Sequence, residues 1–189
     1  MKNLVIKTFN CKNVKSSEDE IRELCAKSDI VFLQETWLRE NELPLLNKLH
    51  LDFYGQGVSA MDMQAGLVVG RPHGGIAILW RKTLASCLRP IFYDDARLMA
   101  IEVTSNNAKM LLVNVYMPCS SCANTDEFVL YLNKLDGIMS SSDSPFCAAI
   151  GDFNADLMVN DQGHFKQAFG EKFMLFVRLK STTLAIIPF

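Results

Sequence analysis

The chain has 189 residues, of which 49% are hydrophobic and 21% are charged, a composition typical of a folded globular protein and not of a disordered segment. Two independent cores would be cramped in this length, so we expect residues 1–189 to form a single domain. The 19 basic and 21 acidic residues give a formal charge of −2, so the overall charge does not attract a polyanion, and nucleic-acid binding would need a local basic surface or a metal ion.

The N-terminal segment predicts a strand and not a signal peptide. Residues 4–9, with the sequence LVIKTF, form a short apolar run that Lys7 interrupts, and no small-residue cleavage site follows. The run ends at Asn10, where we expect the chain to reach the surface. Because no secretory signal is recognised and Cys25 and Cys147 lie in apolar patterns, we expect reduced thiols and an intracellular location, nuclear or cytoplasmic, and no secretion.

A helix and a second strand are predicted next. Ser17 stands three residues before Glu20, which is the spacing of a capping box, and the apolar residues that follow recur at helical spacing. We therefore predict a helix that starts at about Ser17. Residues 30–33, IVFL, are rich in β-branched and aromatic side chains and predict a buried strand, with Gln34 and Glu35 at its C-terminal end.

The middle of the chain predicts three strands without intervening helices, which favours antiparallel pairing there. These strands are expected at residues 74–80, 98–103 and 109–117. Thr125 can cap a helix whose apolar side chains repeat at helical spacing, and residues 146–150, FCAAI, predict a further strand leading into Gly151. This order of elements predicts an α/β fold in which two packed mixed β-sheets are flanked by helices.

Polar side chains stand where four of these strands end. They are Asn10, Glu35, Tyr116, Asp152 and Asn154. Phosphodiester hydrolysis requires a hard divalent cation, a positioned water and donors for the phosphate oxygens, and residues from several strand ends can converge to provide them. In this interpretation Glu35 is a ligand of Mg²⁺ or Mn²⁺, Asp152 orients or deprotonates the water, and Asn154 and Tyr116 donate to phosphate. Taken singly, each residue also has a purely structural explanation, since Asp and Asn form turns readily.

Six segments, taken together and in order, carry a family resemblance. They are TFNCKNV, VFLQETWL, GGIAILW, RLMAIEV, LLVNVYMP and AIGDFNAD, within residues 4–176. In these segments the chain resembles the endonuclease/exonuclease/phosphatase superfamily. The phrases GGIAILWR and VNVYMPC make it most similar to the endonuclease domains of non-LTR (LINE-type) retrotransposons.

The resemblance implies a DNase I-like four-layer α/β sandwich that nicks DNA with Mg²⁺ or Mn²⁺, by in-line attack of a water held near Asp152. It assigns the metal and phosphate roles to Asn10, Glu35, Tyr116, Asp152 and Asn154. It also implies a reverse transcriptase domain as a partner in the parent element. Arg97 matches a family arginine to which we assign no role at this stage.

The C-terminal part departs from the family pattern, in which a further Asp and a Ser-Asp-His segment typically follow. The three histidines, His50, His73 and His164, do not stand in such a context. Arg178 and Lys180 interrupt the last apolar stretch, so no membrane span is expected. We therefore expect a C-terminally truncated or degenerate domain with impaired activity and an unpaired sheet edge.

Several alternatives stay open at this point. The CSSC segment at residues 119–122 would suit a redox dithiol, although a lone CxxC is weak evidence. Abasic-site repair nucleases, deadenylases, sphingomyelinases and inositol-phosphate phosphatases share the same framework of Asn, Glu and Asp-x-Asn, and substrate choice depends on loops such as residues 55–75. The chain is also compatible with a non-catalytic, transposon-derived relic that binds nucleic acid or protein.

Overall fold

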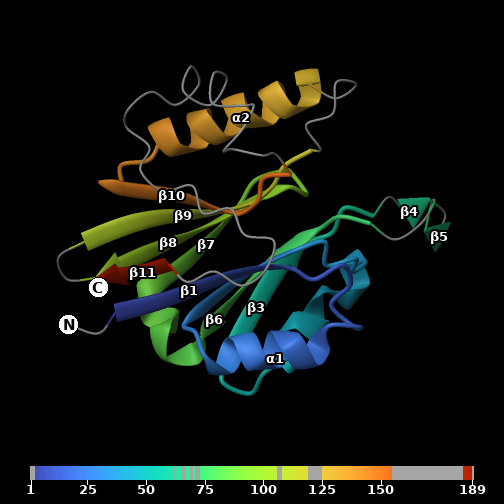
Figure 1. The fold of residues 1–189 in the computed structure, drawn as a ribbon, viewed down its shortest axis with the longest axis horizontal. Coiled ribbons are helices and arrows are strands. Elements are labelled where there is room, and N and C mark those ends of the chain that lie inside the picture. Colours follow the sequence, from blue (N-terminus) through green and yellow to red (C-terminus); the bar gives the residue numbers. More distant parts are fainter. Residues whose placement is uncertain are drawn as a thin grey trace.

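The computed structural model describes residues 3–61, 63–64, 67–68, 70, 73–105, 108–118, 125–154 and 185–188 (Figure 1). The elements are β1 (Asn3–Asn10), α1 (Glu18–Ala26), β2 (Ile30–Gln34), the 3₁₀ segment η1 (Glu40–Lys48), β3 (Phe53–Val58), β4 (Met63–Gln64), β5 (Leu67–Val68), β6 (Ile76–Arg81), the 3₁₀ segment η2 (Lys82–Cys87), β7 (Leu88–Phe92), β8 (Leu98–Ser105), β9 (Ala108–Tyr116), α2 (Thr125–Ser140), β10 (Phe146–Asp152) and β11 (Ala185–Pro188). Among the described residues, no helix has the length and apolar character needed to cross a membrane.

The strands form two main sheets, and both are mixed. One sheet has the order β11-β1-β2-β6-β3, with β1 and β2 parallel and the other neighbours antiparallel. The other has the order β10-β9-β8-β7, with β9 and β10 parallel and the rest antiparallel. Strands β4 and β5 form a separate ribbon to one side of the sandwich (Figure 1).

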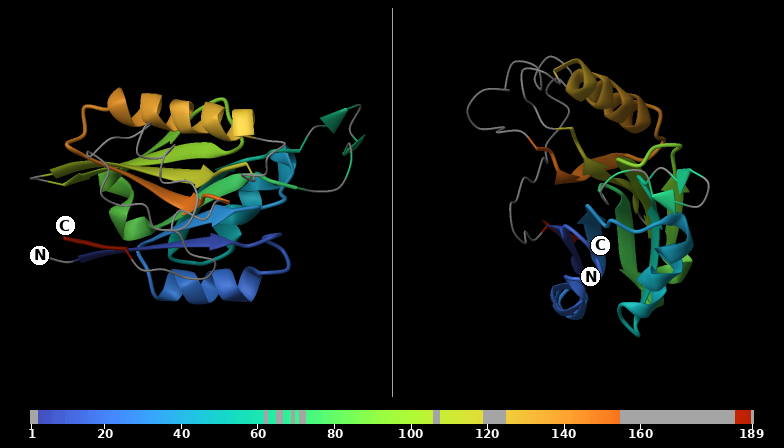
Figure 2. Two further views of the ribbon diagram at one scale, coloured as in Figure 1. Left: turned by 45° about the horizontal axis from the view of Figure 1, so that its top comes forward. Right: turned by 90° about the vertical axis from the view of Figure 1, so that its right-hand side faces the viewer.

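The two sheets face one another, and helices cover their outer faces (Figure 2). Buried side chains of β2, β6, β8 and β9 fill the space between the sheets, Phe32 and Leu112 among them. A second cluster joins α1 and η1 to the first sheet, and a third joins α2 to the second sheet through residues such as Phe128 and Val113. The predicted α/β fold of two packed mixed sheets flanked by helices is therefore confirmed.

The central strands are apolar on both faces because each is covered on both sides. In β2, Ile30 and Phe32 face the other sheet, whereas Val31 and Leu33 face α1 and η1. All four side chains are fully buried. Strands buried on both faces read as continuous hydrophobic runs and not as alternating patterns. This explains why the run IVFL was recognisable as a strand.

The antiparallel pairing expected in the middle of the chain is present between β8 and β9, but two other local predictions are wrong. The strand now bounded as Ile76–Arg81 pairs with β2 and β3, and so lies in a different sheet from β8 and β9 instead of pairing with them. Ser17 does not form a capping box, because its hydroxyl donates to the Cys11 carbonyl oxygen, 2.8 Å away, and its side chain makes no cap hydrogen bond. Strand β11 pairs with β1 in antiparallel register.

Gly151 allows β10 to lie against β9. A Cβ atom at this position would be 2.0 Å from the carbonyl oxygen and 2.8 Å from the amide nitrogen of Val115. Both atoms belong to the backbone of the neighbouring strand, so they cannot move aside as a flexible side chain would. The glycine therefore lets the chain reach Asp152 while β10 stays paired to β9.

We predict that Gly151→Ala destabilises the protein by about 1–3 kcal/mol, as overpacking typically does. Thermal unfolding of the purified variant would measure the loss. Gly137→Ala is the matched control, since a Cβ there meets no atom within 4 Å and alanine favours the helix. Equal melting temperatures for Gly151→Ala and the wild type would contradict the close approach of the two strands.

Candidate active site

The five predicted site residues come from the ends of two parallel strand pairs. Asn10 lies beside Gln34 in the β1–β2 register, and Glu35 follows Gln34 directly. In the other sheet, Tyr116 lies beside Asp152 in the β9–β10 register. Since parallel strands end at the same edge of a sheet, each pair brings its polar side chains to one place. The packing of the two sheets then brings the two edges together.

Asn10 connects the carboxylates of the two sheets. Its side-chain nitrogen Nδ2 donates to Glu35 Oε1 at 2.9 Å and to Asp152 Oδ2 at 2.8 Å. The Tyr116 hydroxyl also donates to Glu35 Oε1, at 3.1 Å. The predicted convergence of Asn10, Glu35, Tyr116 and Asp152 is therefore present in the structure, although 142 positions separate Asn10 from Asp152.

Trp37 is a further member of the cluster that the sequence analysis missed. Its indole Nε1 donates to Glu35 Oε2 at 3.3 Å, so both oxygens of this carboxylate accept hydrogen bonds. The sequence could have indicated this contact, because in the segment QETW the indole of Trp37 follows the carboxylate of Glu35 by two positions. All three donors to Glu35 are neutral, and none of the ion pairs formed between described residues includes Glu35 or Asp152.

Asp152 and Asn154 form the turn that follows β10. The Asn154 backbone nitrogen donates to Asp152 Oδ1 at 3.0 Å, and the Asn154 side-chain Nδ2 donates to the Met117 carbonyl oxygen at 2.8 Å. The turn-forming explanation for these residues is therefore correct as well. It does not compete with a chemical role, since the turn leaves Asp152 Oδ2 facing Asn10.

The backbone around the cluster adopts conformations that ordinary residues avoid. Glu35, Trp37 and Asn154 have φ values of 54°, 53° and 48°. The segment that holds Glu35 is fixed by backbone hydrogen bonds from Thr36 to Gly75 and from Trp37 to Gly74. Left-handed conformations at residues other than glycine are costly and gather at functional sites, where the surrounding structure enforces them.

The Tyr116 hydroxyl is a neutral donor over the whole physiological range. Partial burial, and next the negative charge of Glu35, raise the pKa of Tyr116 to about 12. The hydroxyl therefore keeps its proton at neutral pH and can donate it to an oxygen atom. It is too weak an acid to transfer that proton readily.

The raised pKa values make the fold sensitive to alkali. Burial raises the pKa of Cys11 and of Cys25 to about 12, as it does for Tyr116. The thiol pKa is higher in the folded protein than in the unfolded chain. The contribution of the thiols to the free energy of unfolding is therefore complete below the ordinary thiol pKa of about 8.5 and is lost as the pH rises through 12. We predict a constant melting temperature up to pH 8 and a progressive fall above it. Cys25→Ala should make that fall shallower, and a flat profile to pH 11 would contradict the burial of the thiols.

His50 takes no part in the hydrogen bonds described for the cluster. His50 accepts a hydrogen bond from the Asp52 backbone nitrogen and packs edge-on against Phe53. His73 is exposed, and His164 and residues 119–122 lie outside the described residues. Cys11, Cys25, Cys87 and Cys147 are free thiols. Over the part of the chain that the structure describes, no three His, Cys, Asp or Glu side chains are placed to hold a metal ion.

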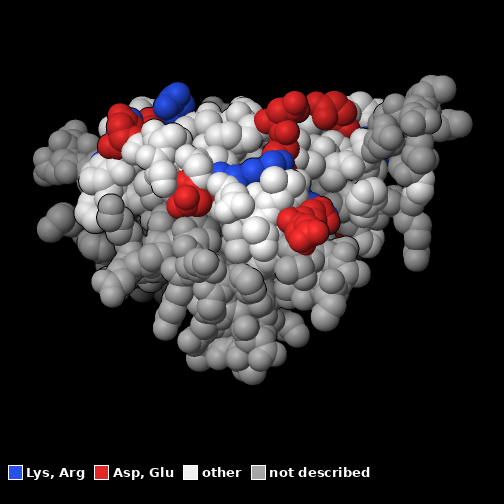
Figure 3. Space-filling model, turned by 90° about the horizontal axis from the view of Figure 1, so that it is seen from above, with Lys and Arg blue, Asp and Glu red and all other residues white. Residues whose placement is uncertain are grey.

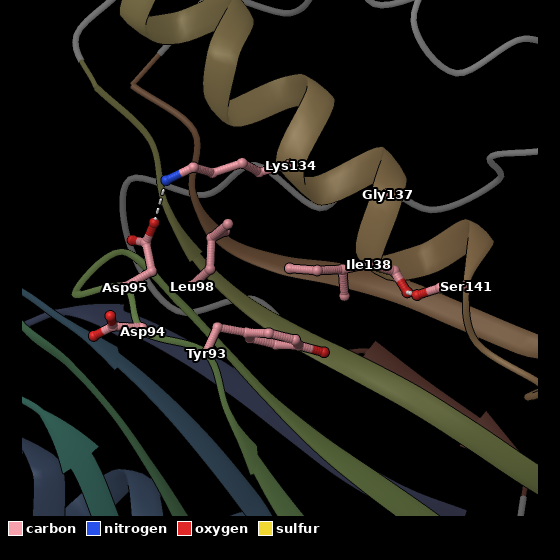
Figure 4. A pocket seen from close by; sticks show the side chains of 8 residues that line it. All are labelled: Tyr93, Asp94, Asp95, Leu98, Lys134, Gly137, Ile138 and Ser141. Carbon is pink, nitrogen blue, oxygen red and sulfur yellow. Dashed lines mark hydrogen bonds and ion pairs between the residues drawn. The ribbon is translucent and has the colours of Figure 1, made fainter.

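A separate pocket of about 370 Å³ lies between α2 and the connection from β7 to β8 (Figure 4). Tyr93, Asp95, Lys134 and Ile138 are among the residues that line it, and none of the five site residues does. On the face seen from the side of α2, the described charged side chains are acidic at several places and basic at a few (Figure 3).

Comparison with known proteins identifies the fold. A profile of the Endonuclease/Exonuclease/phosphatase family matches residues 8–170. No curated protein matches the sequence significantly.

Solved structures with the same fold include three from different organisms. The 3′ phosphatase NExo from Neisseria, bound to product DNA hairpin, has a TM-score of 0.57 at 17% identity, over 80% of this chain and 58% of that one. An AP endonuclease from Archaeoglobus fulgidus has a TM-score of 0.56 at 19% identity, over 80% and 58%. TDP2 from D. rerio, complexed with single strand DNA product, has a TM-score of 0.58 at 18% identity, over 82% and 62%. The chain spans about three fifths of the length of these proteins.

Proposed function

The chain belongs to the endonuclease/exonuclease/phosphatase family, and we propose that it hydrolyses phosphodiester bonds at the cluster of Asn10, Glu35, Tyr116, Asp152 and Asn154. The observation that carries the proposal is the pair of hydrogen bonds from Asn10 Nδ2 to Glu35 and Asp152. Those bonds bring two carboxylates from different sheets to one nitrogen atom. Two anionic groups held together by neutral donors form a site that favours a cation.

The donor set suits Mg²⁺ or Mn²⁺, and members of the family typically use divalent metal ions. Mg²⁺ is usually bound by one or two carboxylates, with waters and substrate phosphate as the remaining ligands, so a closed cage of three acidic residues is not required. Glu35 would supply one such carboxylate ligand, and the negative charge of Asp152 beside it would add to the attraction of the cation. The described thiol nearest in sequence to the site, Cys11, directs its sulfur to the carbonyl oxygens of Gln34 and Glu35 and not to the carboxylates.

The residues of the chain would divide the reaction among them. When bound, the cation neutralises charge on the phosphate and on the leaving oxygen. Glu35 would hold the cation, and the orientation of the Glu35 carboxylate is fixed by Asn10, Tyr116 and Trp37.

Asp152 would accept the proton of the attacking water or orient that water, since its Oδ2 accepts a hydrogen bond from the neutral side chain of Asn10. In this proposal the Asn154 side-chain amide donates to a phosphate oxygen, and the Tyr116 hydroxyl does so once a phosphate oxygen replaces Glu35 Oε1 as its acceptor.

We propose DNA as the substrate and nicking as the reaction. The phrases GGIAILWR and VNVYMPC support an endonuclease of the retrotransposon type, and a reverse transcriptase domain in the same element would be its natural partner. Two of the proteins that share the fold, NExo and TDP2, are described with DNA products bound, which is compatible with this choice. The near-neutral charge of the chain implies that DNA binding depends strongly on the cation.

Nicking of supercoiled plasmid tests the proposal. We expect the purified chain to produce open circles in Mg²⁺ and none when the metal is chelated, and Asp152→Asn to lower the rate by about a hundred- to a thousandfold. Asp143→Asn is the matched control, because Asp143 is an exposed carboxylate that pairs with Lys109 away from the cluster. A folded wild type that never nicks would support the relic hypothesis, and an active Asp152→Asn variant would place the chemistry elsewhere.

A further inference from the structure

Arg97 lies directly behind Tyr116 and contacts it in three ways. The Arg97 carbonyl oxygen accepts the Tyr116 backbone N–H at 2.9 Å, and Arg97 Nη1 donates to the Tyr116 carbonyl oxygen at 3.3 Å. The guanidinium carbon lies over the Tyr116 ring, 5.0 Å from its centroid. The backbone and the ring of Tyr116 are thus held by a single residue that immediately precedes β8.

Groups from α2 and from the turn before β8 hold Arg97 in place. The guanidinium also lies over the Tyr131 ring at 5.7 Å, and its Nη2 is 3.9 Å from Glu127. Asp95, whose side chain is only 7% exposed, accepts the Arg97 backbone N–H at 2.8 Å and pairs with Lys134 at 2.7 Å. Figure 4 shows Lys134 reaching from α2 to Asp95. A chain of contacts therefore leads from α2 through Arg97 to Tyr116.

We propose that Arg97 is a positioning residue, which holds the Tyr116 ring at the angle that directs its hydroxyl to Glu35 Oε1. The inference rests on the proposed function of the Tyr116–Glu35 pair. A half-buried tyrosine ring whose hydroxyl donates one hydrogen bond can still tilt, unless another group packs against the face of the ring. The cation–π contact and the two backbone hydrogen bonds remove that freedom.

A direct contact from Arg97 to the DNA backbone is the competing explanation. The Arg97 side chain is 30% exposed, and its guanidinium already engages a carbonyl oxygen and two aromatic rings. A phosphate-binding arginine would instead present most of its donors to solvent. The geometry therefore favours positioning, and the two roles affect different kinetic constants.

The test combines Arg97→Met, Arg97→Lys, Tyr116→Phe and the double variant Arg97→Met/Tyr116→Phe. Methionine keeps the aliphatic stem without the charge, lysine keeps a cation for the ring, and melting curves establish that each variant is folded. Nicking of a short duplex in Mg²⁺ gives kcat and KM for each variant.

The second measurement is the ¹³Cζ chemical shift of Tyr116, which responds to the hydrogen bond of its hydroxyl. It is read at neutral pH in tyrosine-labelled protein without metal or DNA. Tyr116→Phe assigns the signal, and Glu35→Ala gives its value without the Glu35 acceptor.

Positioning predicts that Arg97→Met lowers kcat by about tenfold, the equivalent of 1.4 kcal/mol, with KM unchanged. In the Tyr116→Phe background the same substitution should have little further effect, because the hydroxyl that it orients is already absent. The Tyr116 ¹³Cζ shift should move toward its value in Glu35→Ala, and Arg97→Lys should restore both kcat and the shift in large part.

Other results would overturn the inference. A rise in KM with altered salt dependence and an unmoved ¹³Cζ shift would make Arg97 a DNA contact. Equal losses of kcat in the wild-type and Tyr116→Phe backgrounds would mean that Arg97 does not act through the hydroxyl. If the wild type fails to nick DNA, the proposed function fails, whereas the ¹³Cζ shift still decides whether Arg97 positions Tyr116.

Discussion

Replacing Glu35 with glutamine should reduce Mg²⁺-dependent nicking by about a hundred- to a thousandfold, the loss seen when one transition-state contact is removed. The substitution keeps the size and planarity of the side chain and removes its charge. Glu35 is the point at which Asn10, Tyr116 and Trp37 converge, so no other described carboxylate can take over its place. The glutamine amide would also direct N–H donors at side chains that are themselves donors to Glu35. Rates measured at several Mg²⁺ concentrations would show whether more metal compensates.

Glu102→Gln is the control for this result. Glu102, on β8, is a shielded carboxylate, 12% exposed, that pairs with Arg89 of β7 and Lys109 of β9 and takes no part in the cluster. We expect the nicking rate of Glu102→Gln to stay close to that of the wild type. An undiminished rate for Glu35→Gln at saturating Mg²⁺ would show that Glu35 is not a metal ligand.

The second large effect concerns stability, and it arises from Asn114, which is fully buried between the sheets. Its Nδ2 donates to the carbonyl oxygens of Leu33 and Ala77, at 3.0 and 2.9 Å, and its Oδ1 accepts from Gln34 Nε2 at 2.7 Å. The amide therefore connects β9 to β2 and β6 at the position just before Glu35. A buried polar network of this kind stabilises only while every member is satisfied.

Asn114→Leu should lower the free energy of unfolding by about 2–5 kcal/mol, because it keeps the volume and leaves the Gln34 amide and two carbonyl oxygens without their partner. At roughly 2–4 °C per kcal/mol for a chain of this size, the melting temperature should fall visibly. Thr8→Val is the matched control, since it removes a single buried hydrogen bond to Gln34 and should cost only about 0.5–1.5 kcal/mol. An Asn114→Leu protein as stable as the wild type would mean that the amide is dispensable.

The strands that could be predicted are those whose burial leaves a clear pattern. The run of residues 30–33 is covered on both faces and is apolar throughout, and Thr125–Ser140 carries one apolar face at helical spacing.

Strand β3 was missed because its inner positions include Gly55 and Gly57, which replace apolar side chains where η1 packs closely. A Cβ on Gly55 would lie 2.8 Å from Leu46 Cβ. Strand β7 was missed because Pro90 argues against a strand, although proline is tolerated at a sheet edge.

The composition of the site was more predictable than its connections. Polar residues at strand ends identified Asn10, Glu35, Tyr116, Asp152 and Asn154, since parallel strands deliver their ends to one edge. Their mutual hydrogen bonds depend on how the two sheets face each other, which no local pattern encodes. The contact of Trp37 with Glu35 is local and could have been inferred from QETW, whereas the contacts of Arg97 depend on the pairing of β8 with β9 and on the packing of α2.

Calorimetric titration with Mn²⁺, in the absence of DNA, would test whether the Asn10-linked pair of Glu35 and Asp152 is a cation site at all. Mn²⁺ takes oxygen ligands like those of Mg²⁺ and is held more tightly by the same donors. We predict one Mn²⁺ per wild-type chain and at least tenfold weaker binding, a difference of about 1.4 kcal/mol, for Glu35→Gln and for Asp152→Asn, with Glu102→Gln unchanged. A wild type that binds no Mn²⁺, or variants that bind it as tightly as the wild type, would contradict this account.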